Sequence, residues 1–177
     1  MKKILTFLIT VSVCAILFIL AKGIFLKVLK ANDRDDRIKT LPSFSLGTLN
    51  GEIFNSADLK NGPLLLVYFH PDCDYCQYEI SSLIRHDIQS KGVKVLLVSN
   101  ALPETIDEFM EQFETGQDEF CILSDSSLVF ANLFGISVIP VSLIYNENLE
   151  LIKFFKGEVS PNAILNFLND VCQYQEN

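Results

Sequence analysis

Two cysteines separated by two residues, Cys73 and Cys76, are the side chains of this sequence with the clearest capacity for chemistry. The chain has five cysteines, and those at positions 14, 121 and 172 are not spaced to react with a near neighbour. Two neighbouring thiols can form and break a disulfide, a reaction that transfers two electrons. The spacing therefore predicts a redox-active pair.

Two other uses of the same pair are open. Two cysteines three positions apart can supply half of a zinc site, but zinc needs two further ligands, and His70 and His86 are the histidines of the chain. A structural disulfide is the other use, although closing so short a loop adds little stability. We expect no bound metal. Cys121 and Cys172 lie within apolar patterns and are interpreted as small core residues.

A strand and a helix must position the pair. Residues 64–69 form a continuous apolar run with a proline on either side, which indicates a strand buried on both faces. After Cys73, apolar residues recur at helical spacing as far as residue 92. Cys73 would then lie at the first turn of a helix, where unpaired backbone N–H groups and the helix dipole favour a thiolate. Cys76, one turn later and more buried, would resolve the mixed disulfide formed by Cys73.

Further elements follow from hydrophobic periodicity and turn residues. Asn50-Gly51 predicts a hairpin between residues 44–46 and 52–54. The remaining pattern predicts a strand at 93–98, a helix from Pro103, a strand at 120–123, a helix at 126–134, a hairpin of 141–145 with 149–155, and a last helix begun by Ser160 and Pro161. Alternating strands and helices of this kind predict an α/β domain.

The N-terminal segment is long and apolar enough to cross a membrane. Residues 4–21 carry no charge, and the apolar character extends to residue 26. Eighteen helical residues span about 27 Å, close to the thickness of the hydrocarbon core. A cleaved signal has a shorter apolar centre and a small-residue cleavage site, and none is convincing here. We expect a membrane anchor over residues 1–29, inserted through residues 4–26, with a cleaved signal and a soluble protein as the alternative.

A charged segment separates this anchor from the domain. Residues 30–40 read as a solvated linker, and the domain is expected to occupy residues 41–177. The lysines and arginines that follow the span would by themselves keep the domain in the cytoplasm. An apolar segment after a short basic start is, however, the common arrangement for export, and we favour a domain outside the cytoplasm.

The charges of the domain exclude one class of function. Residues 1–39 hold eight Lys/Arg against three Asp/Glu, whereas residues 40–177 hold six against nineteen. Nucleic-acid binding requires clustered Lys and Arg to neutralise phosphates. We therefore expect no nucleic-acid partner.

The order of these motifs resembles that of thioredoxin-fold proteins. A strand is followed by the run from Phe69 to Cys76 and a helix, and Ile139-Pro140 precedes the last hairpin. The beginning of the domain, residues 41–46 with residues 50–52, is similar to the membrane-anchored thiol-disulfide oxidoreductases and redoxins of bacteria. The resemblance implies a central mixed sheet flanked by helices, with an N-terminal β-hairpin extension and a transmembrane helix.

This resemblance also implies an activity. It implies thiol-disulfide exchange through Cys73 and Cys76, with Pro140 in the cis form against the pair. The implied partners are protein thiols or disulfides and a redox protein that donates electrons, and no cofactor is expected. The implied location is the bacterial inner membrane, with a single-pass anchor and the domain facing the periplasm.

Several residues depart from the family pattern. The family often has Trp before the first cysteine, where this chain has Asp72, and Gly-Pro between the cysteines, where it has Asp74-Tyr75. Negative charge beside Cys73 opposes a thiolate there. Many thioredoxins carry a buried Asp at the place of Val67, so proton transfer to and from Cys76 needs another group. Glu79, His70 and water are the candidates, although a strand-end or turn-capping role for His70 is the more favoured interpretation.

Two functions from other classes remain as alternatives. A thiol peroxidase shares the fold, but its motif wants Thr three residues before the reactive cysteine, where Cys73 has His70, and Pro seven before, where it has Leu66. A membrane-tethered module that binds thiols or metal through the cysteine loop, without turnover, is the second alternative. A trapped mixed disulfide would favour the enzyme.

Overall fold

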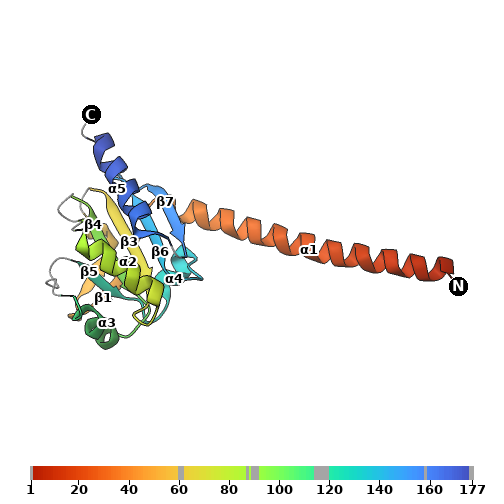
Figure 1. The fold of residues 1–177 in the computed structure, drawn as a ribbon, viewed down its shortest axis with the longest axis horizontal. Helices are drawn as coiled ribbons and strands as arrows, with labels where there is room; N and C mark the ends of the chain where they lie inside the picture. The colour runs from red at the N-terminus through yellow and green to blue at the C-terminus, as the bar shows by residue number, and fades with distance from the viewer. Residues whose placement is uncertain are drawn as a thin grey trace. The chain divides into compact units, whose positions relative to one another are not determined.

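The computed structural model describes residues 2–59, 62–86, 88, 92–113, 120–157 and 159–175. The chain separates into two units, residues 1–37 and residues 38–177. The first unit is helical, and the second contains the sheet and the remaining helices (Figure 1).

Helix α1 spans Lys2–Ile38. Its window Ser12–Leu29 has a mean hydropathy of 2.2 and no buried residue, so by length and composition this helix could cross a membrane. The helix continues through residues 30–38, where the charge pattern led us to expect a linker. Lysine, alanine and arginine, which make up part of this segment, are good helix formers.

A sheet of seven strands forms the centre of the second unit as far as it is described. The strands are β1 (Ser45–Thr48), β2 (Ile53–Asn55), β3 (Leu64–Phe69), β4 (Lys94–Ser99), β5 (Cys121–Ser124), β6 (Val141–Tyr145) and β7 (Leu151–Lys156). Their spatial order is β2-β1-β5-β4-β3-β6-β7. β3 pairs in parallel with β4 and antiparallel with β6, and β4 pairs in parallel with β5. The sheet is therefore mixed, and β3 is a central strand.

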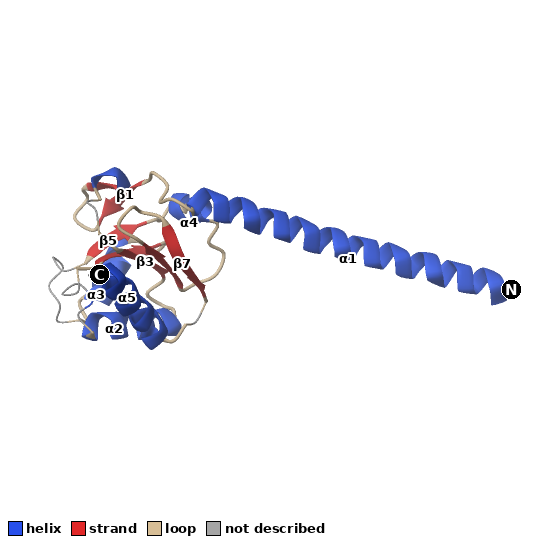
Figure 2. Ribbon diagram, turned by 90° about the horizontal axis from the view of Figure 1, so that it is seen from above, coloured by secondary structure: helices blue, strands red, loops and turns tan. Residues whose placement is uncertain are grey.

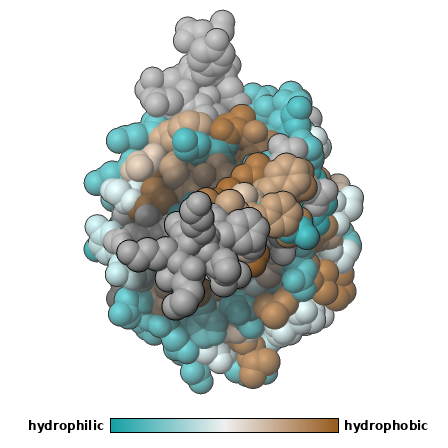
Figure 3. Space-filling model, turned by 90° about the vertical axis from the view of Figure 1, so that its right-hand side faces the viewer, coloured by the Kyte–Doolittle hydropathy of each residue, from teal (hydrophilic) through white to brown (hydrophobic). Residues whose placement is uncertain are grey.

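Helices cover both faces of this sheet. α2 (Asp74–Arg85), α3 (Pro103–Met110) and α5 (Pro161–Gln175) lie on one face, and α4 (Val129–Phe134) lies on the other (Figure 2). Successive β3 side chains point to opposite faces, so Val67 joins the core cluster beneath α2, α3 and α5, whereas Tyr68 joins the cluster beneath α4. Hydrophilic side chains lie around much of the edge of the face drawn in Figure 3.

The core beneath α4 contains a buried carboxyl group. Asp125 is fully buried, and its two side-chain oxygens accept hydrogen bonds from the backbone N–H groups of Phe130 and Ala131, both at 2.9 Å. The hydroxyl of Tyr68 donates to the same carboxylate at 3.0 Å. Two of these donors belong to the N-terminal turn of α4, so Asp125 joins the start of this helix to the central strand.

The structure confirms most of the predicted elements and moves some boundaries. The hairpin at Asn50-Gly51, the buried strand β3 and the hairpin of β6 with β7 are all present. α2 ends at Arg85, earlier than the periodicity indicated, and α4 begins at Val129 rather than near residue 126. α4 starts late because Leu128 adopts a left-handed conformation, with φ of 58°, in the turn that Asp125 begins.

Replacing Asp125 should destabilise the domain strongly. Asp125→Ala removes two helix-capping acceptors and leaves the buried Tyr68 hydroxyl without this partner, so we expect a loss of about 3 kcal/mol in the free energy of unfolding. Denaturant unfolding of the detergent-solubilised chain, followed by tyrosine fluorescence, measures this loss. Tyr68→Phe keeps both caps and should cost only about 1 kcal/mol, and the exposed Glu147→Ala serves as a control. An Asp125→Ala loss no larger than that of the control would contradict the expectation.

Candidate active site

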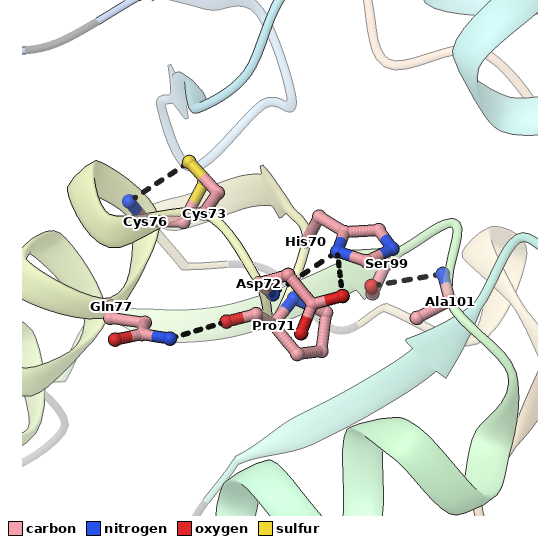
Figure 4. A network of polar contacts seen from close by, with 8 residues as sticks. All are labelled: His70, Pro71, Asp72, Cys73, Cys76, Gln77, Ser99 and Ala101. Carbon is pink, nitrogen blue, oxygen red and sulfur yellow. Dashed lines mark hydrogen bonds and ion pairs between the residues drawn. The ribbon is translucent and has the colours of Figure 1, made fainter.

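The candidate site is built on the turn between the end of β3 and the start of α2. β3 ends at Phe69, and Cys73 occupies the N-cap position of α2. The backbone N–H of Cys73 donates to the carbonyl of His70 at 3.1 Å, and the side-chain amide of Gln77 donates to the carbonyl of Pro71 at 2.7 Å (Figure 4). These two bonds join the loop after β3 to the N-terminal residues of α2. They hold Cys73 at the point where the helix begins.

The two cysteines differ in accessibility. Cys73 is partly exposed, Cys76 is fully buried, and both are free thiols in this structure. The backbone N–H of Cys76 donates to Sγ of Cys73 at 3.3 Å (Figure 4). Burial raises the pKa of the Cys76 thiol well above its usual range, as do the hydrogen bond with Cys73 and the negative charge of Glu79. Solvent can therefore reach Cys73, whereas the Cys76 thiol lies inside the fold.

Glu79 lies one helical turn beyond Cys76, and its side chain is only 2% exposed. Its Oε1 accepts a hydrogen bond from the hydroxyl of Ser142 on β6. Burial raises the pKa of this carboxyl to about 7, while the hydrogen bond from Ser142 opposes the increase. Glu79 can therefore carry or release a proton near neutral pH beside the buried thiol.

Glu79 was predicted from the sequence as a proton-transfer candidate, whereas Ser142 was not. Ser142 is 1% exposed and lies 63 positions from Glu79 in the chain. Its pairing with Val67 places the hydroxyl on the sheet face that α2 covers. A signal was present, because a serine inside the apolar strand 141–145 must find a hydrogen-bond partner when it is buried.

His70 makes its polar contacts within the turn. Its Nδ1 accepts a hydrogen bond from the backbone N–H of Asp72 at 3.1 Å, and the same atom lies 3.8 Å from Oδ2 of Asp72. The ring is directed towards Asp72 and Ser99 rather than towards the cysteines (Figure 4). The Asp72 side chain is 84% exposed. This geometry matches the turn-capping interpretation of His70.

Pro140 follows a cis peptide bond, as the resemblance to thioredoxin-fold proteins implied. It is buried and directly precedes β6, whose residue Val141 pairs with Tyr68 at the end of β3. Ile139, on the other side of the cis bond, packs against the core cluster that contains Cys76. The turn at Pro140 therefore lies at the same end of the sheet as the cysteines.

The other cysteines lie elsewhere. Cys121 is half-buried at the start of β5, where burial raises the pKa of its thiol, and it packs against the core beneath α4. Cys14 is exposed on α1. The prediction of a core position for Cys172 concerns a side chain outside the described residues.

Together, the mixed sheet, the flanking helices and the dithiol at a helix N-terminus define a thioredoxin-like protein. A solved structure of a secreted Mycobacterium tuberculosis disulfide oxidoreductase homologous to E. coli DsbE has a TM-score of 0.64 to this chain, with 20% sequence identity. That likeness covers 77% of this chain and 98% of the other. The expected thioredoxin-like fold is confirmed.

The sequence model of the AhpC/TSA family matches residues 39–153, and the chain belongs to this family. Among curated proteins it is 23% identical over 129 residues to the thiol-disulfide oxidoreductase ResA of Halalkalibacterium halodurans, covering 71% of this chain and 72% of the relative. It is also 23% identical over 135 residues to ResA of Geobacillus thermodenitrificans, covering 75% and 76%. The resemblance to bacterial redoxins and thiol-disulfide oxidoreductases is therefore confirmed.

The buried Glu79 carboxyl should leave a signature in the pH dependence of stability. Its pKa is about 7 in the folded state and 4.5 without burial, so the folded chain retains a proton that the unfolded chain releases. The free energy of unfolding should therefore fall by about 3 kcal/mol as pH rises from 4.5 to 7, with no further contribution above that range. Glu79→Gln should remove this fall, as measured by urea unfolding of the solubilised chain at several pH values.

The exposed Glu104 provides the matched control for this measurement. Glu104→Gln should retain the slope of the wild-type chain, because this side chain is exposed to water in the folded chain as it is in the unfolded chain. A slope that persists in Glu79→Gln would show that another group causes it.

Proposed function

We propose that this protein is a membrane-tethered thiol-disulfide oxidoreductase that reduces or exchanges disulfides of proteins outside the cytoplasm through Cys73 and Cys76. The observation that carries the proposal is the asymmetry of the pair: the Cys73 sulfur is partly exposed and accepts the N–H of Cys76, whose own thiol is buried. One sulfur is placed to meet a partner, and the other is placed to release it. The ResA relatives support this assignment.

In the reducing direction, the Cys73 thiolate attacks one sulfur of a partner disulfide. A bond forms between Cys73 and that sulfur, and the other partner sulfur leaves as a thiolate that takes up a proton. Cys76 then loses its proton and attacks Sγ of Cys73, which releases the first partner sulfur as a thiol. The partner gains two electrons, and Cys73 and Cys76 become a disulfide. A second redox protein must return two electrons and two protons before the next cycle.

Glu79 is the group we assign to proton transfer with Cys76. Its carboxyl lies close enough for its charge to act on the Cys76 thiol, and its pKa of about 7 suits a base that must also be reprotonated at neutral pH. His70 is less suited, because its Nδ1 is held by the backbone of Asp72. Glu79 on α2 would thus do the work of the buried Asp that many thioredoxins carry at the place of Val67.

Pro140 and Asp72 are assigned supporting roles. The cis bond before Pro140 turns the chain at the end of the sheet that holds the cysteines, so a partner segment that reaches Cys73 would lie along this turn. Asp72 is exposed and directly precedes Cys73, so its negative charge would lie beside a partner that reaches the Cys73 sulfur.

The N-terminal helix supports a tethered location. Its window Ser12–Leu29 has a mean hydropathy of 2.2 despite Lys22 and Lys27, and it is exposed within the chain's own fold, as a membrane-crossing segment would be. We assign residues 1–29 to the anchor and place the domain on the periplasmic side of the bacterial inner membrane. The electron donor would then be a second redox protein on that side.

Trapping experiments test the exchange reaction. Cys76→Ser removes the sulfur that resolves the mixed disulfide, so partner proteins should remain bound to Cys73 and migrate as adducts in non-reducing gels that dithiothreitol dissolves. Cys73→Ser should trap none, because Cys76 is buried. Cys121→Ser, which alters a half-buried thiol away from the pair, should behave as the wild-type chain.

The two alternative functions predict other results. A binding module would retain its partner without a disulfide in both cysteine variants, and this result would contradict the proposal. A thiol peroxidase would consume hydroperoxide at a rate that depends on Cys73, and the wild-type chain should show no such activity above the level of Cys73→Ser.

Thiol labelling tests the location. A membrane-impermeant maleimide added to intact spheroplasts, with the outer membrane opened, should modify Cys73 in the Cys76→Ser variant as fully as it does after lysis. A cytoplasmic protein with an exposed cysteine should be labelled only after lysis. Labelling of Cys73 only after lysis would place the domain in the cytoplasm, the orientation that the lysines after the span favour.

A further inference from the structure

Ser142 is a polar residue in an otherwise apolar strand beside the site. β6 has the sequence VSLIY, all five of its residues are buried, and Ser142 is 1% exposed. It follows Pro140 by two positions and pairs with Val67 of β3. A buried hydroxyl costs stability unless it makes a hydrogen bond, and this one donates to Oε1 of Glu79.

We propose that Ser142 is a positioning residue for disulfide exchange: its hydroxyl holds the Glu79 carboxyl beside Cys76 in both protonation states, which sets the pH range over which Cys76 resolves a mixed disulfide. This inference rests on the function proposed above. It concerns a residue that acts through Glu79 rather than one that touches the partner.

A hydroxyl is suited to this task because it is both donor and acceptor. It donates to Glu79 when the carboxyl is ionised, and after rotation it can accept the proton of the neutral acid. Within the described residues, Ser142 is the hydrogen-bond partner of this 2% exposed carboxyl. An apolar side chain in its place would leave the ionised carboxyl without that donor, and the neutral acid would then be favoured.

Few titratable groups that the structure describes interact with the Glu79 carboxyl and influence its protonation. On its own helix, Cys76 is the titratable group that interacts with it, and Cys73 interacts with Cys76 in turn. The hydrophobic core cluster beneath α2 includes Val67 of β3, Ile144 of β6 and Ile164 of α5. Burial favours the neutral acid, and Ser142 opposes burial.

Threonine and valine provide a matched pair of substitutions at this strand position. They have nearly the same shape, and only threonine keeps the hydroxyl. In the solubilised full-length chain, the Glu79 carboxyl can be titrated by carbon-13 NMR, with Glu79→Gln identifying its signal. We expect Ser142→Val to raise the midpoint by about one to two pH units above that of the wild-type chain. Ser142→Thr should keep the wild-type midpoint.

The resolving step can be followed separately. In a background with alanine at positions 14, 121 and 172, reduced protein reacts with Ellman's reagent in two phases. Attack by Cys73 releases the first thionitrobenzoate, and attack by Cys76 on the resulting mixed disulfide releases the second. At pH 7, Ser142→Val should slow the second phase about tenfold and move its pH profile upward, while the first phase is unchanged.

Two controls separate positioning from a general loss of structure. Ser56→Ala removes another buried hydroxyl, one that accepts the N–H of Phe44, and should change neither the titration nor the second phase. Ser142→Val combined with Glu79→Gln should match Glu79→Gln alone, because the serine acts through the carboxyl.

Three results would overturn the inference: an unchanged midpoint in Ser142→Val, an equal shift in Ser142→Thr, or a slowing by Ser142→Val that persists without the carboxyl. Failure of the proposed function would differ, since a chain with no second phase at all would not be a dithiol oxidoreductase. The carboxyl titration would still report on the contact between Ser142 and Glu79 in that case.

Discussion

The exclusion of water from Cys76 and Glu79 is the constraint on which the candidate site depends. A carboxyl and a thiol that lie side by side in water would titrate independently, near their ordinary pKa values. Here both side chains are buried on the inner side of α2. A charge on one therefore interacts with the other without screening by solvent. The raised pKa values of both groups therefore depend on the tight packing of α2 against the sheet.

Two cores of different character support this arrangement. The face beneath α2, α3 and α5 is apolar around the buried polar contact of Glu79 with Ser142. The opposite face is built on stacked and edge-on aromatic rings, with Phe130 4.0 Å from Phe134 between ring centroids and Phe44 against both. Asp125 ties this aromatic layer to β3 through Tyr68. β3 is thus packed on both faces. The position of the turn that follows it, which carries Cys73, is fixed by this packing.

Local patterns were sufficient to predict the elements that place the cysteines. The apolar run of β3, the helical periodicity after Cys73 and the turn at Asn50-Gly51 each act over a few residues, so the sequence alone reveals them. The contact of Glu79 with Ser142 joins positions 63 apart, and it depends on the register of β6 against β3, which no short pattern determines. The late start of α4 has a local cause instead: the left-handed conformation of Leu128 delays the helix, and Asp125 accepts the N–H groups of Phe130 and Ala131, five and six positions away. Hydrophobic periodicity does not reveal such a turn.

The different roles proposed for the two cysteines follow from their different positions and burial. Cys73 occupies an N-cap, where it receives the N–H of Cys76 and faces solvent on one side. Cys76 cannot meet a partner before Cys73 has reacted, because its sulfur is enclosed by the core. Its thiol also resists ionisation in the resting state, which prevents it from competing with Cys73. In the proposed reaction, a bond between Cys73 and a partner would remove the interaction with Cys73 that raises the pKa of the Cys76 thiol, and Glu79 would accept its proton. Under the proposed mechanism, burial would therefore impose the order of the two steps: attack by Cys73 at the surface first, and resolution by Cys76 from the interior second.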